Sequence, residues 1–178
     1  MTRLSISIGP DEHVQGNPEA GCSLVEYGDY ECPSCAQLQP VIKKLQRHFG
    51  SRLSFVFRNF PLREMHPWAE AAAETAEFAG AHGKFWEMHD LLIENQAILS
   101  GSLLLDLANR LGLSSTELDT ALNAKTYRHK VLDDFEGGVR NGVNGTPTLF
   151  IDDQRYDGSL DSESLADAIG ETLLQTEA

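Results

Sequence analysis

The chain has 178 residues, 41% hydrophobic and 23% charged, a composition typical of one globular domain. Its 27 acidic residues outnumber the 14 basic ones, which gives a formal charge of −13. This excess of negative charge argues against a protein that binds nucleic acid or an anionic membrane surface.

The sequence indicates neither a secretory signal nor a membrane helix. Residues 1–20 contain no apolar h-region and no plausible cleavage site. No run approaches the roughly 18 apolar residues that a membrane helix needs. The three cysteines are too few for a disulfide-stapled scaffold. We therefore expect a cytoplasmic protein without membrane insertion, in which a CxxC motif indicates redox or metal chemistry.

Two strands are predicted in the N-terminal part of the chain. Residues 4–8 (LSISI) alternate between apolar and polar side chains, as in a short strand. Residues 9–21 contain Gly, Pro, Asn and Asp and are predicted to form a loop. A second strand begins at Cys22, and the acidic Glu26 lies among its apolar residues.

A helix and a third strand follow. Apolar residues recur at three- and four-residue spacing from Pro33 onwards, which predicts a helix, and Gly50 is its expected C-terminal stop. Residues 53–61 (LSFVFRNFP) are predicted to form a strand that ends at Pro61. This strand, helix and strand form a unit typical of α/β folds.

The middle of the chain is predicted to be helical. Helical patterns cover residues 66–96, with a break at 80–83, then residues 102–113, 114–125 and about 127–141. Ser114 or Ser115 is the expected N-cap of the third of these segments.

The C-terminal part is predicted to form a hairpin and a closing helix. Residues 145–158 (GTPTLFIDDQRYDG) indicate a strand, a turn at Asp152 and Asp153, and a second strand. Residues 161–175 form an amphipathic pattern that Asp161 or Ser162 caps. The order β, β, α, β, helical block, β, β, α predicts an α/β or α+β architecture with a helical insertion.

The pair Cys32 and Cys35 is the main candidate for chemistry. Cys32 follows a strand and precedes Pro33, a residue well suited to the first position of a helix. At a helix N-terminus, free backbone N–H groups and the helix dipole stabilise a thiolate and lower the pKa of the thiol. Cys35 lies one turn further along and is expected to be more buried. Cys32 is thus predicted to be the nucleophile, and Cys35 the thiol that resolves a mixed disulfide.

Glu26 is the candidate proton acceptor. A carboxylate within an apolar strand is costly unless it is hydrated or used, and burial would raise its pKa. It is therefore a candidate to exchange a proton with Cys35. The alternative is that Glu26 simply points to solvent.

The segment Thr146-Pro147 comes directly before a strand rich in β-formers. Proline at this place indicates a fixed turn, for which a cis peptide bond is one possibility. Local spacing alone does not establish the cis form, because only about 5% of X-Pro bonds adopt it.

Four segments in family order resemble the bacterial DsbA family of thiol–disulfide oxidoreductases, over about residues 11–165. They are LVEYGDYECPSC, FVFRNFPL, HPWAEAAAETAEFAGAHGKFWEMHDLL and NGVNGTPTLFIDDQRYDG. The chain is most similar to the branch that is also found fused to the C-terminus of some sodium/proton antiporters. The resemblance implies a thioredoxin-like fold, a mixed sheet flanked by helices, in one domain over residues 1–178. Its thioredoxin-like part would cover about residues 1–62 and 142–178, and the helical insertion about residues 63–141.

The resemblance also implies roles for single residues. Cys32 matches the nucleophilic cysteine, Cys35 the resolving cysteine and Glu26 the buried acid beneath them. Pro147 matches the cis-proline that faces the disulfide, and the backbone of Thr146 is implied to pair with a bound substrate strand, a form of β-augmentation.

Two positions depart from the best-known periplasmic members of the family. The second position between the cysteines, which together with Pro33 is expected to face the substrate, is Ser34 where those members have His. A neutral hydroxyl is a weaker donor to a thiolate than a charged imidazole. Thr146 likewise stands where some strong oxidases have Val. We therefore expect a less oxidising pair, and the direction of electron flow stays open.

Other candidate residues are given structural interpretations. Cys22 is expected to be a small buried hydrophobe. A zinc site built on the CxxC is a minor alternative, because only one further cysteine exists and no histidine stands at a typical ligand spacing. His66, His82 and His89 are predicted to be surface or capping residues rather than metal ligands.

The sequence is thus interpreted as a DsbA-like protein-disulfide oxidoreductase in which Cys32 and Cys35 exchange electrons with protein or small-molecule thiols. No cofactor or metal beyond the cysteine pair is expected, and the redox recycling partner is unknown. The competing hypothesis is a thioredoxin-like redox-sensing or accessory binding module without turnover.

Overall fold

A computed structural model describes residues 8–176 of the chain. The strand predicted over residues 4–8 lies, apart from Ile8, outside this described part. Within residues 8–176, no helix is both long and apolar enough to cross a membrane.

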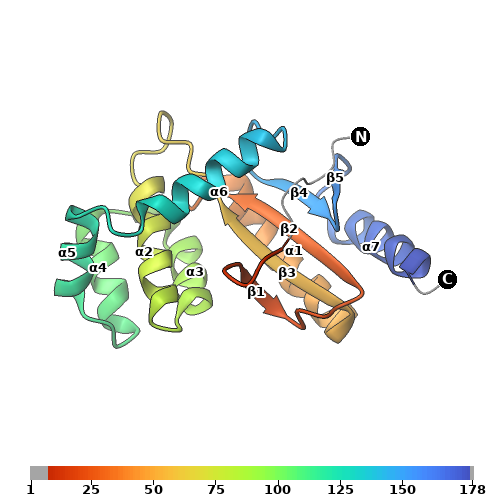
Figure 1. The fold of residues 1–178 in the computed structure, drawn as a ribbon, viewed down its shortest axis with the longest axis horizontal. Coiled ribbons are helices and arrows are strands. Elements are labelled where there is room, and N and C mark those ends of the chain that lie inside the picture. Colours follow the sequence, from red (N-terminus) through yellow and green to blue (C-terminus); the bar gives the residue numbers. More distant parts are fainter. Residues whose placement is uncertain (1–7, 177–178) are drawn as a thin grey trace.

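A single five-stranded mixed sheet forms the centre of the molecule (Figure 1). Its order is β1-β3-β2-β4-β5; β2 and β3 are parallel, and the other neighbours are antiparallel. The strands are β1 (His13–Gly16), β2 (Cys22–Gly28), β3 (Leu53–Asn59), β4 (Thr148–Ile151) and β5 (Gln154–Tyr156). The predicted thioredoxin-like mixed sheet is thereby confirmed.

The prediction of a continuous loop over residues 9–21 is wrong, because β1 lies within it. His13 to Gly16 pair with β3, with His13 opposite Phe57 and Gly16 opposite Ser54. The strand is four residues long and ends at Gly16, whose φ of 96° suits glycine. Such a short edge strand is specified by its partner rather than by its own pattern.

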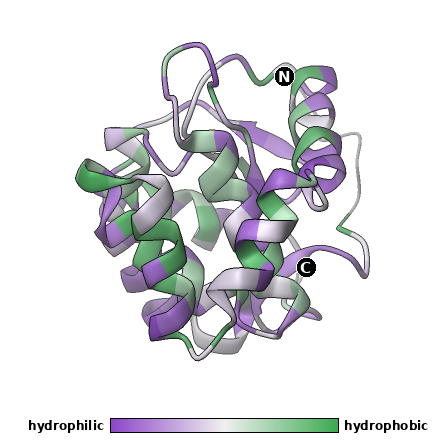
Figure 2. Cartoon of the chain, turned by 90° about the vertical axis from the view of Figure 1, so that its left-hand side faces the viewer, coloured by the Kyte–Doolittle hydropathy of each residue, from purple (hydrophilic) through white to green (hydrophobic). Residues whose placement is uncertain are grey.

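The described part of the chain forms seven α-helices in addition to the sheet. They are α1 (Pro33–Phe49), α2 (Ala69–Ala81), α3 (Phe85–Glu94), α4 (Gly101–Arg110), α5 (Ser115–Asn123), α6 (Arg128–Arg140) and α7 (Ser162–Thr176). Helices α2 to α5 gather at one end of the molecule, and α6 runs from them to the sheet (Figure 1). Seen from that end, hydrophobic and hydrophilic segments alternate along the helices, as expected of amphipathic helices (Figure 2). The predicted helices and the hairpin β4–β5 are confirmed in order.

Alternate residues of the central strands enter two different clusters, so both faces of the sheet are covered. Leu24 and Phe55 belong to the larger cluster, which includes residues of α1, α7 and the helical block. Val25 and Tyr27 lie on the opposite face of β2. They belong to a smaller cluster that includes Phe60 and lies next to α6. Successive side chains of a strand point to opposite faces of the sheet, so this burial pattern fixes the register of β2 and the direction in which each of its side chains points.

Helix α1 follows directly from its sequence. Leu38, Ile42, Leu45 and Phe49 are buried and share one face. Its C-cap, Gly50, has a φ of 55°, a conformation that favours glycine at helix ends. The helix therefore lies on the sheet with its N-terminus just beyond the end of β2, which places the CxxC motif.

Candidate functional site: a thiol pair at the start of helix α1

Cys32 is the N-cap of α1, with Pro33 in the first helical turn. Its backbone is extended (φ −76°, ψ 117°), and its carbonyl accepts hydrogen bonds from the N–H groups of Cys35 and Ala36. Cys32 is 7% exposed and Cys35 is 2% exposed, so the expectation that Cys35 is the more buried thiol is confirmed. Both are free thiols, and the geometry is that of the dithiol form.

The environment of Cys32 stabilises its thiolate. A hydrogen bond from Cys35 is the largest cause, and together with Thr146 and the backbone N–H groups of Cys35 and Ser34 it overcomes burial and lowers the pKa of Cys32 to about 5. The same pairing, together with burial and the nearby Glu26, raises the pKa of Cys35 far above that of an ordinary thiol. The two sulfurs thus differ strongly in acidity, although they are separated by only one helical turn.

The loop before β4, although far from Cys32 in the sequence, lies against the Cys32 sulfur. The sulfur of Cys32 lies 3.3 Å from the carbonyl oxygen of Thr146, to which it donates a hydrogen bond when it is protonated. The peptide bond between Thr146 and Pro147 is cis, the conformation that the family resemblance implied. Thr146 and Pro147 are half-buried, and Pro33 and Ser34 are exposed. The binding of substrate by these four residues stays a prediction.

Glu26 is buried, so the alternative in which it points to solvent is wrong. It lies on β2 between Phe57 of β3 and Leu149 of β4, and it is 2% exposed. Burial, the largest cause, raises the pKa of Glu26 to about 8, although a hydrogen bond with Cys35 opposes the shift. A side chain at Gly28 would come within 2.9 Å of its carboxylate, so the small residue leaves room for it. Its part in proton exchange stays a prediction.

The segment 29–32 is held in place by contacts that sequence reasoning missed. The Asp29 carboxylate accepts hydrogen bonds from the N–H groups of Glu31 (2.7 Å) and Leu62 (2.8 Å) and from the imidazole of His66 (2.8 Å). Glu31 in turn accepts a hydrogen bond from the N–H of Trp68. The loop between β3 and α2 thus fixes the residues just before the CxxC.

Gln96, in the 3₁₀ helix Gln96–Ile98 that follows α3, fixes the same segment from another side. Its side-chain amide donates to the carbonyl oxygens of Tyr30 (3.0 Å) and Cys32 (2.8 Å). No local pattern distinguishes this glutamine from a surface residue, because its partners are backbone atoms far away in the sequence.

The prediction that His89 is a surface or capping residue is wrong. His89 is 1% exposed, and its Nδ1 lies 3.0 Å from the hydroxyl of Tyr30. Burial lowers its pKa to about 3, which keeps the ring neutral. It packs against Phe57 and Trp86 and is part of the core that joins the helical block to the sheet.

Cys22 is buried, as predicted, with 1% exposure. Burial, followed by the nearby Asp152, raises the pKa of this thiol to about 12, so it is a poor nucleophile. Among residues 8–176, no group of three or more histidine, cysteine, aspartate or glutamate side chains is arranged to hold a metal ion.

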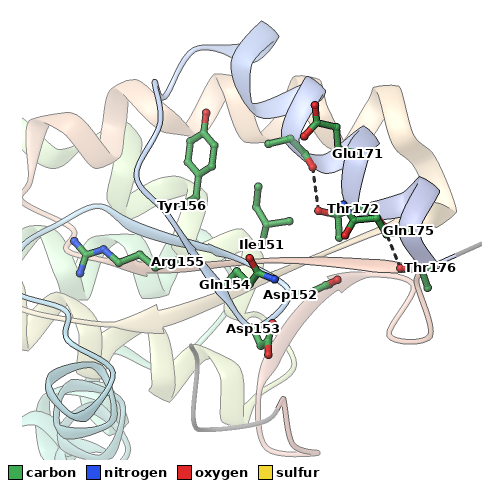
Figure 3. A pocket seen from close by; sticks show the side chains of 11 residues that line it. Ile151, Asp152, Asp153, Gln154, Arg155, Tyr156, Glu171, Thr172, Gln175 and Thr176 are labelled. Atoms are coloured by element: carbon green, nitrogen blue, oxygen red, sulfur yellow. Dashed lines mark hydrogen bonds between the residues drawn. The ribbon is translucent and has the colours of Figure 1, made fainter. Parts of the chain in front are cut away.

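A polar hollow of about 330 Å³ lies between the hairpin β4–β5 and α7 (Figure 3). Asp153, Arg155 and Glu171 are among the residues that line it, and none of the predicted site residues does. It is therefore a feature separate from the thiol pair.

The mixed sheet, the thiol pair at the start of α1, the buried acid and the facing proline loop define a DsbA-like protein of the thioredoxin fold. A family model described as thioredoxin matches residues 9–171. The chain belongs to this thioredoxin family.

Two solved structures are similar to this chain over most of its length. BdbD from Bacillus subtilis, in its oxidised form, has a TM-score of 0.84 and 25% identity, and 92% of this chain and 93% of that chain are covered. A thioredoxin-like oxidoreductase from Silicibacter pomeroyi has a TM-score of 0.77 and 26% identity, with 92% of each chain covered. These similarities support a thiol–disulfide oxidoreductase type of function in general.

A much longer relative is named as an antiporter. The Na(+)/H(+) antiporter NhaA 1 of Salinispora arenicola is 40% identical over 167 residues, which are 93% of this chain and 26% of that protein. The chain thus spans about a quarter of the length of this relative, in agreement with the resemblance to the antiporter-fused branch.

Proposed function

We propose that the protein catalyses thiol–disulfide exchange through Cys32 and Cys35, with protein or small-molecule thiols and disulfides as substrates. The observation that carries this proposal is the opposite shift of the two thiol pKa values, lowered to about 5 at Cys32 and strongly raised at Cys35. A nucleophile that is ionised at neutral pH beside a thiol that is protonated is the arrangement a dithiol catalyst needs.

In the reducing direction, the Cys32 thiolate attacks one sulfur of a substrate disulfide. The substrate S–S bond breaks, one substrate sulfur leaves as a thiolate, and a mixed disulfide with Cys32 forms. Cys35 then loses its proton to Glu26 and attacks the Cys32 sulfur. This step releases the second substrate thiolate, leaves the Cys32–Cys35 disulfide, and transfers two electrons to the substrate. The oxidising direction is the reverse.

Glu26 suits the proton step because its raised pKa of about 8 lies close enough to neutral pH for both its protonated and its ionised form to be populated. It is buried beside Cys35, whose thiol would not ionise unaided. We propose that Thr146 and Pro147 on one side, and Pro33 and Ser34 on the other, contact the substrate, with the Thr146 backbone pairing to an extended strand.

We also propose a cytoplasmic location, a pair that works without cofactor or metal, and recycling by a redox partner of thiol or disulfide chemistry. The measurement that sets the direction is the reduction potential. Below about −240 mV the pair would be a reductase in a glutathione-buffered cytosol, and well above it an oxidant.

A second candidate is a redox-sensing or accessory module without turnover. It is favoured by the relative named as an antiporter, of which the similar region is only 26%. In this case the pair would switch between dithiol and disulfide and change the binding of another domain.

The test is dithiothreitol-dependent reduction of insulin, with Cys32→Ser, Cys35→Ser and Cys22→Ser variants. We expect turnover by the wild type and by Cys22→Ser, none by Cys32→Ser, and a trapped mixed disulfide with Cys35→Ser. Absence of turnover, together with a stable Cys32–Cys35 disulfide in glutathione buffer, would reject catalysis in favour of the sensing module.

A further inference from the structure

His66 is anchored to the turn that precedes the thiol pair, by a carboxylate that has no access to solvent. The side chain of Asp29 is 0% exposed, and its Oδ2 accepts the hydrogen bond from Nδ1 of His66 at 2.8 Å. The same oxygen accepts the N–H of Leu62 at 2.8 Å, and the other accepts the N–H of Glu31 at 2.7 Å. The imidazole therefore has a fixed position, with 18% of its side chain exposed to solvent.

The same aspartate is part of the turn that carries the nucleophile. The carbonyl oxygen of Asp29 accepts the N–H of Cys32 at 3.1 Å, so the anchor of the imidazole and the start of α1 are one rigid turn. The imidazole is thus tied to the same turn as Cys32, and the negative charge of the Cys32 sulfur acts on it.

The charges around the ring favour its protonated form. Partial burial lowers the pKa of His66, but the hydrogen bond to Asp29 and the charges of Asp29, Glu31 and Cys32 outweigh it and raise the pKa above the usual imidazole value. The cation in the same loop, Arg63, is paired with Glu70 of α2. The charged groups that act most strongly on the imidazole, Asp29, Glu31 and Cys32, are anionic, and one of them is the redox-active sulfur.

We propose that His66 is a redox-linked proton site, whose imidazolium, held on Asp29, stabilises the Cys32 thiolate and releases its proton more readily once the pair is oxidised. The inference deepens the proposed thiol–disulfide exchange at the same site. The disulfide carries no charge, so its formation removes one of the anions that hold the proton on the ring. By linkage, the effect of the thiolate on His66 equals the effect of the imidazolium on the thiolate.

The proton balance follows from this coupling. Reduction of the Cys32–Cys35 disulfide by a partner dithiol adds two electrons, breaks the S–S bond and places one proton on Cys35. A further fraction of a proton is then taken up at His66, from solvent. The imidazolium makes the dithiol form more stable and the pair correspondingly more oxidising.

The first test needs no variant. The pKa of His66 is measured by NMR titration of the imidazole signals in the dithiol and disulfide forms of the whole chain, with the exposed His129 as the internal control. We expect the pKa of His66 to be about 0.5–1 unit higher in the dithiol form, and that of His129 to be the same in both. Equal values for His66 in the two forms would overturn the proposal.

The second test removes the charge but keeps the hydrogen bond. In His66→Asn the amide nitrogen can take the place of Nδ1 and still donate to Asp29, and His129→Asn is the matched control. Thiolate absorbance and the pH profile of alkylation should show that His66→Asn weakens Cys32 acidity about threefold to tenfold. The reduction potential should fall by about 15–30 mV, the same factor converted for a two-electron couple.

If a folded His66→Asn variant has an unchanged Cys32 pKa and an unchanged reduction potential, His66 has only a structural role and the proposal is overturned. If that variant does not fold, the titration of the wild type in its two redox forms decides alone. Insulin turnover is a separate readout: a wild type without turnover but with a redox-linked His66 would reject the proposed catalysis and keep the proton site.

Discussion

Replacing Glu26 by glutamine should make the protein more stable at neutral and alkaline pH. The carboxylate lies in the central strand at 2% exposure, and burial raises its pKa to about 8 from the ordinary 4.5. Glutamine has nearly the same shape but no ionisation, so the variant removes the cost of a buried negative charge.

The size of the gain depends on pH in a defined way. Between pH 4.5 and about 8 the folded protein holds a proton on Glu26 that the unfolded chain has released, so the stability of the wild type falls as pH rises through this window. The slope is about 1.4 kcal/mol per pH unit. Relative to the wild type, Glu26→Gln should gain about 2 kcal/mol near pH 6 and about 5 kcal/mol above pH 8, as order-of-magnitude values.

The assay is equilibrium unfolding by urea of the reduced proteins at several pH values. Cys32 contributes with the opposite sign, because its pKa is lowered from 9.0 to about 5 and its term therefore stabilises the folded state increasingly as pH rises through that range. Both proteins contain Cys32, so the difference between variant and wild type reports Glu26 together with its coupling to Cys32. A plot of either protein alone would mix two contributions that partly cancel.

Glu136→Gln is the control, because this α6 carboxylate is 64% exposed and pairs only at 3.7 Å with Arg140. Its effect should stay within about 0.5 kcal/mol at every pH. If the difference in unfolding free energy between Glu26→Gln and wild type does not change with pH, Glu26 ionises normally in the folded protein. Its proposed role as proton acceptor would then be rejected.

Three further predictions concern the site and its support. Thr146→Val should raise the pKa of Cys32, because the side chain of Thr146 helps to lower it. An unchanged alkylation profile would contradict this. Gln96→Leu should slow alkylation of Cys32 while leaving the unfolding midpoint within a few degrees, because the amide fixes the Cys32 carbonyl; equal rates would show that the contact is dispensable. Gly138→Ala should destabilise the protein by about 1–3 kcal/mol, because the added carbon would lie 2.7 Å from the ring of Phe60. Gly170→Ala, at a position on α7 with open space around it, should instead stabilise the protein by about 0.5–1 kcal/mol. Equal effects of the two alanines in thermal unfolding would reject the packing explanation.

Local sequence patterns predicted the regular elements well where the pattern and the tertiary environment agree. Helix α1 is an example, because its apolar spacing and its final glycine are properties of the segment itself. The short strand β1 was missed because four residues with a terminal glycine carry no pattern of their own, and β3 determines the pairing. His89 was misjudged because nothing local shows that the ring lies between the helical block and the sheet.

The site itself was predicted in part. Cys32, Cys35 and Glu26 belong to one segment, and their closeness follows from a strand that leads into a helix. The contacts of Asp29 and Gln96 were not predictable, because their partners are backbone groups and an imidazole brought together only by the folded chain. Acidic and amide side chains in loops are too common for their positions alone to indicate such contacts.

The placement of β4 has a consequence for synthesis of the protein. Strand β2, which leads to the thiol pair, is made before its partner β4, and the contact between Cys32 and Thr146 joins residues that are 114 positions apart. Pairing over such a distance is a slow, late event in folding, because the entropy of closing the loop must be overcome first. A nascent chain therefore exposes an unfinished CxxC until β4 has been made, and Cys32 acquires its full set of contacts only after that.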